Sequence, residues 1–121
     1  MPDLSSSKFF TESVTVTSTS ADGSADVVYT VPDNFSSITR YLLLSNGTNS
    51  TKKAYVQFYH SDDDSYHYLA KGVAMDGHSL LSLSSFGSLN LHEGDKILAY
   101  IEVGMDLDVT ISVEEYYDPN R

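Results

Sequence analysis

The chain has 121 residues, no cysteine, and 17 acidic against 7 basic side chains, which gives a net charge of −10. The missing cysteines exclude disulfides, thiol nucleophiles and cysteine-ligated metal sites, and the negative charge argues against nucleic-acid binding. Hydrophobic residues make up 40% and aromatic residues 12% of the chain, which favours a packed domain over acidic disorder. The start of the chain does not resemble a signal peptide, and no apolar run approaches the roughly 18 residues of a membrane helix, so we expect a cytoplasmic origin and no membrane.

Residues 1–12 are predicted to form a polar N-terminal arm. Strands are then expected at 14–18 and 27–31, on either side of Asp22-Gly23. Asp-Gly favours a two-residue type I′ turn, and a turn centred there joins the two strands as a hairpin. In that hairpin Val16 pairs with Tyr29 and Val14 pairs with Val31.

After Pro32, residues 38–44 are dense in apolar side chains, which is typical of a central strand buried on both faces. Strands at 54–60 and 66–70 surround an acidic segment and predict a second hairpin. Further strands are expected at 79–86 and 88–91.

The last two strands, 96–103 and 107–114, show the clearest alternation of apolar residues in the chain. Folding them about Gly104-Met105-Asp106 as a hairpin aligns both their apolar and their charged residues. The predicted pairs are Ile101 with Val109, Ala99 with Ile111, Ile97 with Val113, and Lys96 with Glu114.

About eight strands at short, regular spacing, with no helical periodicity, predict an all-β fold. We expect an antiparallel β-sandwich, jelly-roll-like, over residues 13–117, followed by a short tail at 118–121. The sequence has neither a Gly-x-Ser-x-Gly nucleophile motif nor a glycine-rich phosphate loop, so we expect neither an enzyme nor a cofactor.

The acidic segment between 54–60 and 66–70 is the one part of the sequence that suggests a metal site. Folding about Asp63-Asp64 places His60 opposite His67, with Asp62 nearby, so two imidazoles and a carboxylate would converge. The segment lacks the spaced oxygen ligands of an EF-hand. The alternative is a solvated hairpin tip without a metal, and this is the interpretation we adopt.

The same register gives the second hairpin an aromatic face. Tyr59 is expected opposite Tyr68, and Val56 and Phe58 point to the other side. Large rings on an outer face suit a protein interface, but a loop of the same chain or a stacked glycan would also explain them. The predicted interface residues are Tyr55, Tyr59, Tyr66, Tyr68, Leu98 and Tyr100.

Four segments follow one another along the chain: Val28-Tyr29-Thr30-Val31-Pro32, Leu43-Leu44-Ser45-Asn46-Gly47, Leu89 to Ile97 with its Gly94-Asp95 turn, and Ile111-Ser112-Val113-Glu114-Glu115. Over residues 14–115 the chain resembles small all-β virion proteins of tailed bacteriophages. The resemblance implies a capsid decoration protein, or a neck or tail accessory protein, which is often a symmetric homo-oligomer without a cofactor. It provides no catalytic residue.

We therefore expect a non-enzymatic structural protein, made in the host cytoplasm and located in the virion, with capsid decoration favoured. It would dock on other virion proteins through its outer sheet face and its termini. The alternative is a carbohydrate-binding module for host attachment.

Overall fold

Strands with alternating apolar residues build two sheets that share one core in the computed structural model, which describes residues 3–83 and 88–119. A single short 3-10 helix, η1 (Asp22–Ser24), lies among the described elements. The strands are β1 (Asp3–Val16), β2 (Asp26–Thr30), β3 (Phe35–Asn46), β4 (Lys52–His60), β5 (Ser65–Met75), β6 (Leu80–Ser82), β7 (Leu89–Leu91), β8 (Lys96–Ile101) and β9 (Leu107–Tyr117).

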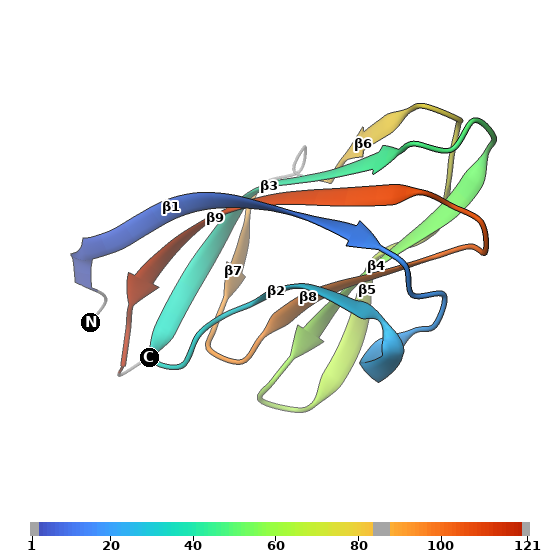
Figure 1. The fold of residues 1–121 in the computed structure, drawn as a ribbon. Helices are drawn as coiled ribbons and strands as arrows, with labels where there is room; N and C mark the ends of the chain where they lie inside the picture. The colour runs from blue at the N-terminus through green and yellow to red at the C-terminus, as the bar shows by residue number, and fades with distance from the viewer. Residues whose placement is uncertain (1–2, 84–87, 120–121) are drawn as a thin grey trace.

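The two sheets form the layers seen in Figure 1, and all their pairings are antiparallel. The first sheet has the order β1-β9-β3-β6, with β7 also paired to β3, and the second has the order β2-β8-β4-β5. Strands β6 and β7 pair with opposite halves of β3, so together they occupy the position of one strand. This confirms the predicted β-sandwich, and its strand order is that of a jelly roll.

Two of the predicted hairpins are wrong, because their strands belong to different sheets. Strand β8 pairs with β2 and β4, whereas β9 pairs with β1 and β3, so Ile101 lies opposite Ala54 instead of Val109. Alternation of apolar residues shows which side of a strand faces inward. It does not show whether the next strand lies beside it or across the core.

The turn predicted at Asp22-Gly23 also differs from the structure. Asp22 has a φ of 57°, but these residues begin the helix η1, and the chain crosses there from β1 in the first sheet to β2 in the second. A type I′ turn needs positive φ at both central residues, and Gly23 is not among the positive-φ residues. The predicted pairing of Val16 with Tyr29 therefore does not form.

The hairpin of β4 and β5 is confirmed, but its register differs from the predicted one. Tyr59 pairs with Tyr66, and His60 pairs with Ser65. Relative to the prediction, β5 is displaced by two residues along β4. A displacement of two residues moves every side chain along its face without moving it to the other face.

Strand β3 is central in its sheet, as predicted, but it is not buried on both faces. Arg40 and Tyr41 are exposed, and the register with β9 shifts between Thr39 and Tyr41. Near the N-terminus, β1 begins at Asp3, so most of the predicted arm belongs to the sheet. Of the predicted strand 79–86, residues 84–86 lie outside the described residues.

The core lies between the inner faces of the two sheets and is almost entirely aliphatic. Fully buried side chains come from both layers, among them Leu44, Ile97, Leu107 and Ile111. Because these residues face one another across the core, β8 and β9 do contribute their alternating apolar residues to the same interior. The outer face of the second sheet has a smaller apolar cluster of its own, formed around Leu98 and Tyr100.

Candidate functional site

The outer face of the second sheet gathers five tyrosines from three adjacent strands, and we call this group the tyrosine surface. Strands β4, β5 and β8 are neighbours in the sheet, and residues two apart on a strand share a face. The members are Tyr55 and Tyr59 on β4, Tyr66 and Tyr68 on β5, and Tyr100 on β8. The predicted grouping of these side chains is present, although Tyr59 lies opposite Tyr66 instead of Tyr68.

Ring contacts and hydroxyl contacts hold the tyrosine surface together. Tyr55 and Tyr100 stack with their centroids 4.3 Å apart and their planes 6° from parallel. The hydroxyls of Tyr68 and Tyr100 share a hydrogen bond of 2.6 Å. Burial and this hydrogen bond raise the pKa of Tyr100, so its hydroxyl stays protonated at neutral pH.

The other half of the tyrosine surface is tied to the tip of the hairpin. Tyr59 and Tyr66 contact each other with centroids 4.9 Å apart, and the Tyr59 hydroxyl donates a hydrogen bond of 2.6 Å to Asp64. That hydrogen bond to a carboxylate, together with desolvation, raises the pKa of Tyr59 to about 12. The rings are therefore fixed in orientation, which lowers the entropy lost on binding a partner.

Two lysines lie over rings of the tyrosine surface. The ammonium of Lys71 is 5.0 Å from the Tyr68 ring centroid, and that of Lys96 is 5.4 Å from the Tyr59 centroid. Both are cation–π distances. These lysines were missed by the sequence analysis, because their approach to the rings depends on a register that the sequence did not specify.

Part of the tyrosine surface is covered by the connection between β1 and β2. Ala25 packs with Leu98 and Tyr100, and Ala21 lies against the same cluster. Leu98 is 2% exposed and Tyr100 is 9% exposed, whereas Tyr68 is 38% exposed. Leu98 and Tyr100 are therefore covered by that connection, and the rings that remain accessible come from β4 and β5.

A buried glutamine fastens that connection to the sheet. Gln57 lies on β4 between Tyr55 and Tyr59 and is only 1% exposed. Its carboxamide accepts a hydrogen bond from the Asp22 backbone N–H and donates one to the Asp22 carboxylate, both of 2.8 Å. The sequence signal for this contact was a polar residue at an outward-facing position between two tyrosines, and the sequence analysis did not use it.

The tip of the same hairpin does not bring together the three candidate metal ligands. His60 lies opposite Ser65, and His67 lies opposite Phe58, so the two imidazoles do not face each other as the predicted register required. His67 instead shares a hydrogen bond of 3.0 Å with the Ser65 hydroxyl. Across 3–83 and 88–119, no group of three histidine or acidic side chains, including His60, Asp62 and His67, is placed to hold a metal ion.

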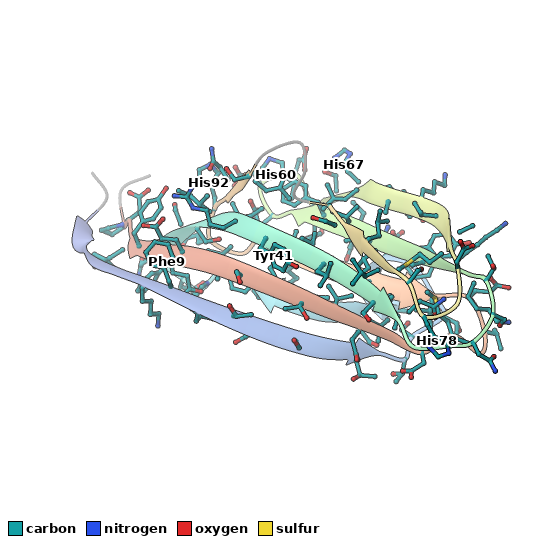
Figure 2. All side chains as sticks on the ribbon, turned by 90° about the horizontal axis from the view of Figure 1, so that it is seen from above. Phe9, Tyr41, His60, His67, His78 and His92 are labelled. Atoms are coloured by element: carbon teal, nitrogen blue, oxygen red, sulfur yellow. The ribbon has the colours of Figure 1, made fainter. Side chains whose placement is uncertain are left out.

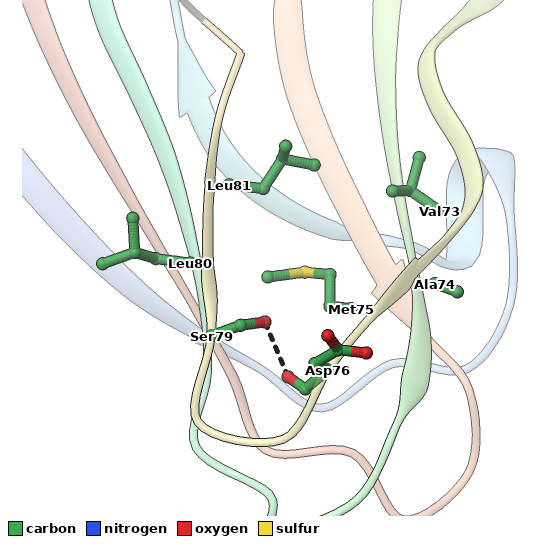
Figure 3. Close-up of a pocket in the computed structure, with 7 residues that line it drawn as sticks. All are labelled: Val73, Ala74, Met75, Asp76, Ser79, Leu80 and Leu81. Carbon is green, nitrogen blue, oxygen red and sulfur yellow. Dashed lines mark hydrogen bonds between the residues drawn. The ribbon is translucent and has the colours of Figure 1, made fainter.

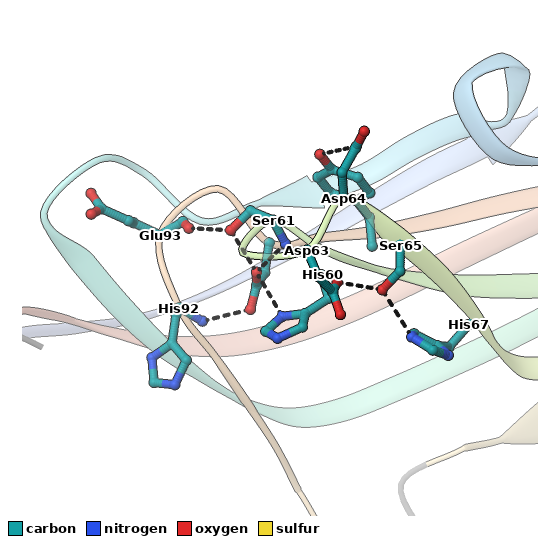
Figure 4. A network of polar contacts seen from close by, with 10 residues as sticks. His60, Ser61, Asp63, Asp64, Ser65, His67, His92 and Glu93 are labelled. Atoms are coloured by element: carbon teal, nitrogen blue, oxygen red, sulfur yellow. Dashed lines mark hydrogen bonds and ion pairs between the residues drawn. The ribbon is translucent and has the colours of Figure 1, made fainter.

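A polar network beneath the tip includes His60, Ser61 and His92 (Figure 4), and its central residue is Asp95. Asp95 is 1% exposed and accepts hydrogen bonds from the backbone N–H groups of Ser61 and His92 and from the Ser61 hydroxyl. Burial opposes its charge, but these donors outweigh burial and lower the pKa of Asp95. His60 Nδ1 lies 3.6 Å from the same carboxylate. The network joins the β4–β5 tip to the turn before β8.

A hollow of about 240 Å³ opens between β5 and β6 (Figure 3). Its lining is mostly aliphatic, with Asp76 as its one ionisable group and with Ser79, whose hydroxyl donates to the Asp76 backbone carbonyl. A single carboxylate does not supply an acid–base pair or a nucleophile with its base. The hollow contains no member of the tyrosine surface.

No protein-family model matches this sequence, and no curated protein is significantly similar to it. Within the described part of the chain, no helix is both long and apolar enough to cross a membrane.

Proposed function

We propose that this chain is a non-enzymatic structural protein of a tailed-phage virion that docks through the tyrosine surface, with capsid decoration as the favoured role. The observation that supports this most is the tyrosine surface itself. It presents rigid aromatic rings on a sheet face that the β1–β2 connection covers only in part, and tyrosine is among the residues most enriched in protein interfaces. Rings already fixed by stacking and hydroxyl contacts lose little freedom on docking.

The size of the surface indicates which neighbouring groups must take part. A specific interface buries about 800 Å² on each partner, and a fully buried tyrosine supplies at most about 250 Å². The accessible rings of β4 and β5 are already more than half covered, so the exposed tip at Asp62 to Asp64 and the exposed Lys71 would complete the contact. A partner with basic groups at the rim would complement the acidic tip.

Jelly-roll architecture is compatible with this role, because viral capsid proteins and lectins both use it. The architecture is shared by too many functions to identify one. Carbohydrate binding remains the alternative, because lectins share this architecture and sugar rings also stack on exposed aromatic side chains. The two roles differ in what the tyrosine surface would contact.

The proposal is tested by adding purified protein to virions assembled without it and measuring the copies bound per particle by mass spectrometry. Tyr66→Ser combined with Tyr68→Ser should reduce binding at least tenfold, because it removes accessible rings. Tyr41→Ser is a matched control, since Tyr41 is 39% exposed on the first sheet and Tyr68 is 38% exposed on the second. Equal binding of both variants would refute docking through the tyrosine surface. Specific binding on a glycan array that the double variant abolishes would favour the carbohydrate-binding alternative.

A further inference from the structure

Strand β1 is a long edge strand whose outer backbone is open. Among the strands that the structure describes, β1 pairs only with β9, so its other edge presents unpaired N–H and C=O groups. From Lys8 to Val16 its pairing with β9 runs without a register shift, and this stretch contains no proline. A regular, unprotected edge of this kind is a template for addition of another strand.

The corresponding edge of the second sheet is protected. Strand β5 is interrupted by register shifts against β4, and Gly72 within it has a φ of 66°. Bulges and a glycine of this kind on an edge strand oppose pairing with another chain. The two long edges are therefore built differently, because β1 has neither a register shift nor a glycine from Lys8 to Val16.

We infer that β1 pairs antiparallel with β1 of a second copy of this chain, about a two-fold axis at Phe10. In this register Lys8 of each copy lies opposite Glu12 of the other, so the two charged side chains between Lys8 and Val16 are self-complementary. In an antiparallel two-fold pair, the numbers of two residues that lie opposite each other average to the number of the residue on the axis. Positions 8 and 12 average to 10, so no other two-fold register places Lys8 opposite Glu12. The two first sheets would then form one continuous sheet.

The exposed ring of Phe9 fits the same register. Phe9 is 68% exposed and lies on the outer face of the first sheet, beyond the reach of the core (Figure 2). In the paired strands Phe9 lies opposite Thr11 of the second copy, and the two Phe9 rings are diagonal neighbours, about 7–8 Å apart at their Cα atoms. Pairing thus covers an apolar side chain that the single chain leaves in water.

Charge also favours pairing through this edge. Two copies with a net charge of −10 repel each other. The stretch from Lys8 to Val16 contains one lysine and one glutamate, so it is neutral. In the pair, each Lys8 would lie between Glu12 of the second copy and its own Glu115, which it already approaches at 3.8 Å. The inference is independent of the proposed virion role.

Charge reversal tests the inference with the full chain. Wild-type protein should elute as a dimer of the 13.3 kDa chain in size-exclusion chromatography with light scattering. Lys8→Glu and Glu12→Lys each place like charges opposite each other twice, and each should weaken self-association roughly tenfold or more. Mixing the two variants restores both opposite-charge pairs, so the mixture should form a heterodimer. Loss of folding in one variant cannot produce this rescue.

Cross-linking provides a second measurement, because the native chain contains no cysteine. Phe10→Cys places the two thiols opposite each other on the axis and should yield an oxidised dimer. Ser13→Cys is the control, since its two copies would be about 20 Å apart along the strands and should not cross-link. A monomeric wild type at its highest soluble concentration, single variants that remain dimeric, or a mixture without heterodimer would each overturn the inference.

Discussion

Gln57 and Asp22 hold each other through two hydrogen bonds although they are 35 positions apart. One residue lies on β4 and the other begins η1, so the pair fixes the β1–β2 connection on the outer face of the second sheet. Both bonds are 2.8 Å long, and Gln57 is almost completely buried. This contact decides how much of the tyrosine surface is accessible.

Gln57→Ala should release that connection and lower the free energy of unfolding by about 2–3 kcal/mol, because two hydrogen bonds are lost at a buried site. It should also increase the exposure of Tyr100, which can be followed by chemical nitration and mass spectrometry. Asp22→Asn is the control. Asparagine retains an acceptor oxygen and tolerates the φ of 57° at this position, so its unfolding should stay close to wild type. Unchanged nitration in Gln57→Ala would contradict the proposed covering role.

Asp95 should make the protein sensitive to acid. Its pKa is lowered in the folded state, so the charged carboxylate contributes stability that is present above the unfolded pKa of about 3.9 and lost as the pH falls below it. Urea unfolding between pH 7 and pH 3 should therefore show a declining free energy of unfolding. Asp95→Asn should be less stable at pH 7 and should lose less stability on acidification.

The control for that prediction is Asp33→Asn. Asp33 is exposed, so this variant removes one negative charge without touching the hydrogen bonds of Asp95. It should reproduce the wild-type acid profile. A wild-type profile in Asp95→Asn as well would mean that the acid sensitivity arises elsewhere.

Thr39 offers a stabilising substitution. Its side chain is 3% exposed, and its hydroxyl has no hydrogen-bond partner among the described residues. Thr39→Val keeps the shape and removes the buried polar atom, so we expect the free energy of unfolding to rise by about 1 kcal/mol. Thr110→Val is the comparison, because the Thr110 hydroxyl shares a hydrogen bond of 2.8 Å with Ser13 on the surface. Denaturant unfolding should show a gain for Thr39→Val alone.

The sequence was sufficient for the fold class because strand alternation is a local property. The inward-facing residues of β8 and β9, such as Ile97 and Ile111, were identified correctly from their spacing. Their pairing was not, because a hairpin and a crossing to the opposite sheet bury the same alternate residues. The choice between them depends on which partners the other strands provide, and that is a property of the whole chain.

The tyrosine surface was likewise predicted only in part. The shared face of Tyr55, Tyr59, Tyr66 and Tyr68 follows from alternation within β4 and β5. The covering of Tyr100 does not, because it depends on where the β1–β2 connection lies after crossing between sheets. The predicted register, which placed His60 opposite His67, was wrong for a smaller reason. The hairpin turns through a four-residue tip at positions 61–64, which displaces β5 by two residues relative to the predicted register.

Tyr29 should be the most sensitive aromatic position, because it satisfies a buried carboxylate. Its hydroxyl donates a hydrogen bond of 2.6 Å to Glu115, which is 3% exposed. Tyr29→Phe should lower the free energy of unfolding by about 2–3 kcal/mol, since a hydrogen bond to a buried charged group is lost. Tyr41→Phe, on the exposed face of β3, should have little effect.

Alkaline pH should reduce the difference between wild type and Tyr29→Phe. Burial, followed by the hydrogen bond to Glu115, raises the pKa of Tyr29 in the folded state. The contribution of Tyr29 is therefore complete below the unfolded pKa of about 10 and declines as the pH rises above it. Urea unfolding of both proteins at pH 8 and near pH 11 measures this change. A difference that is constant across this range would show that the Tyr29 hydroxyl does not remain protonated against Glu115.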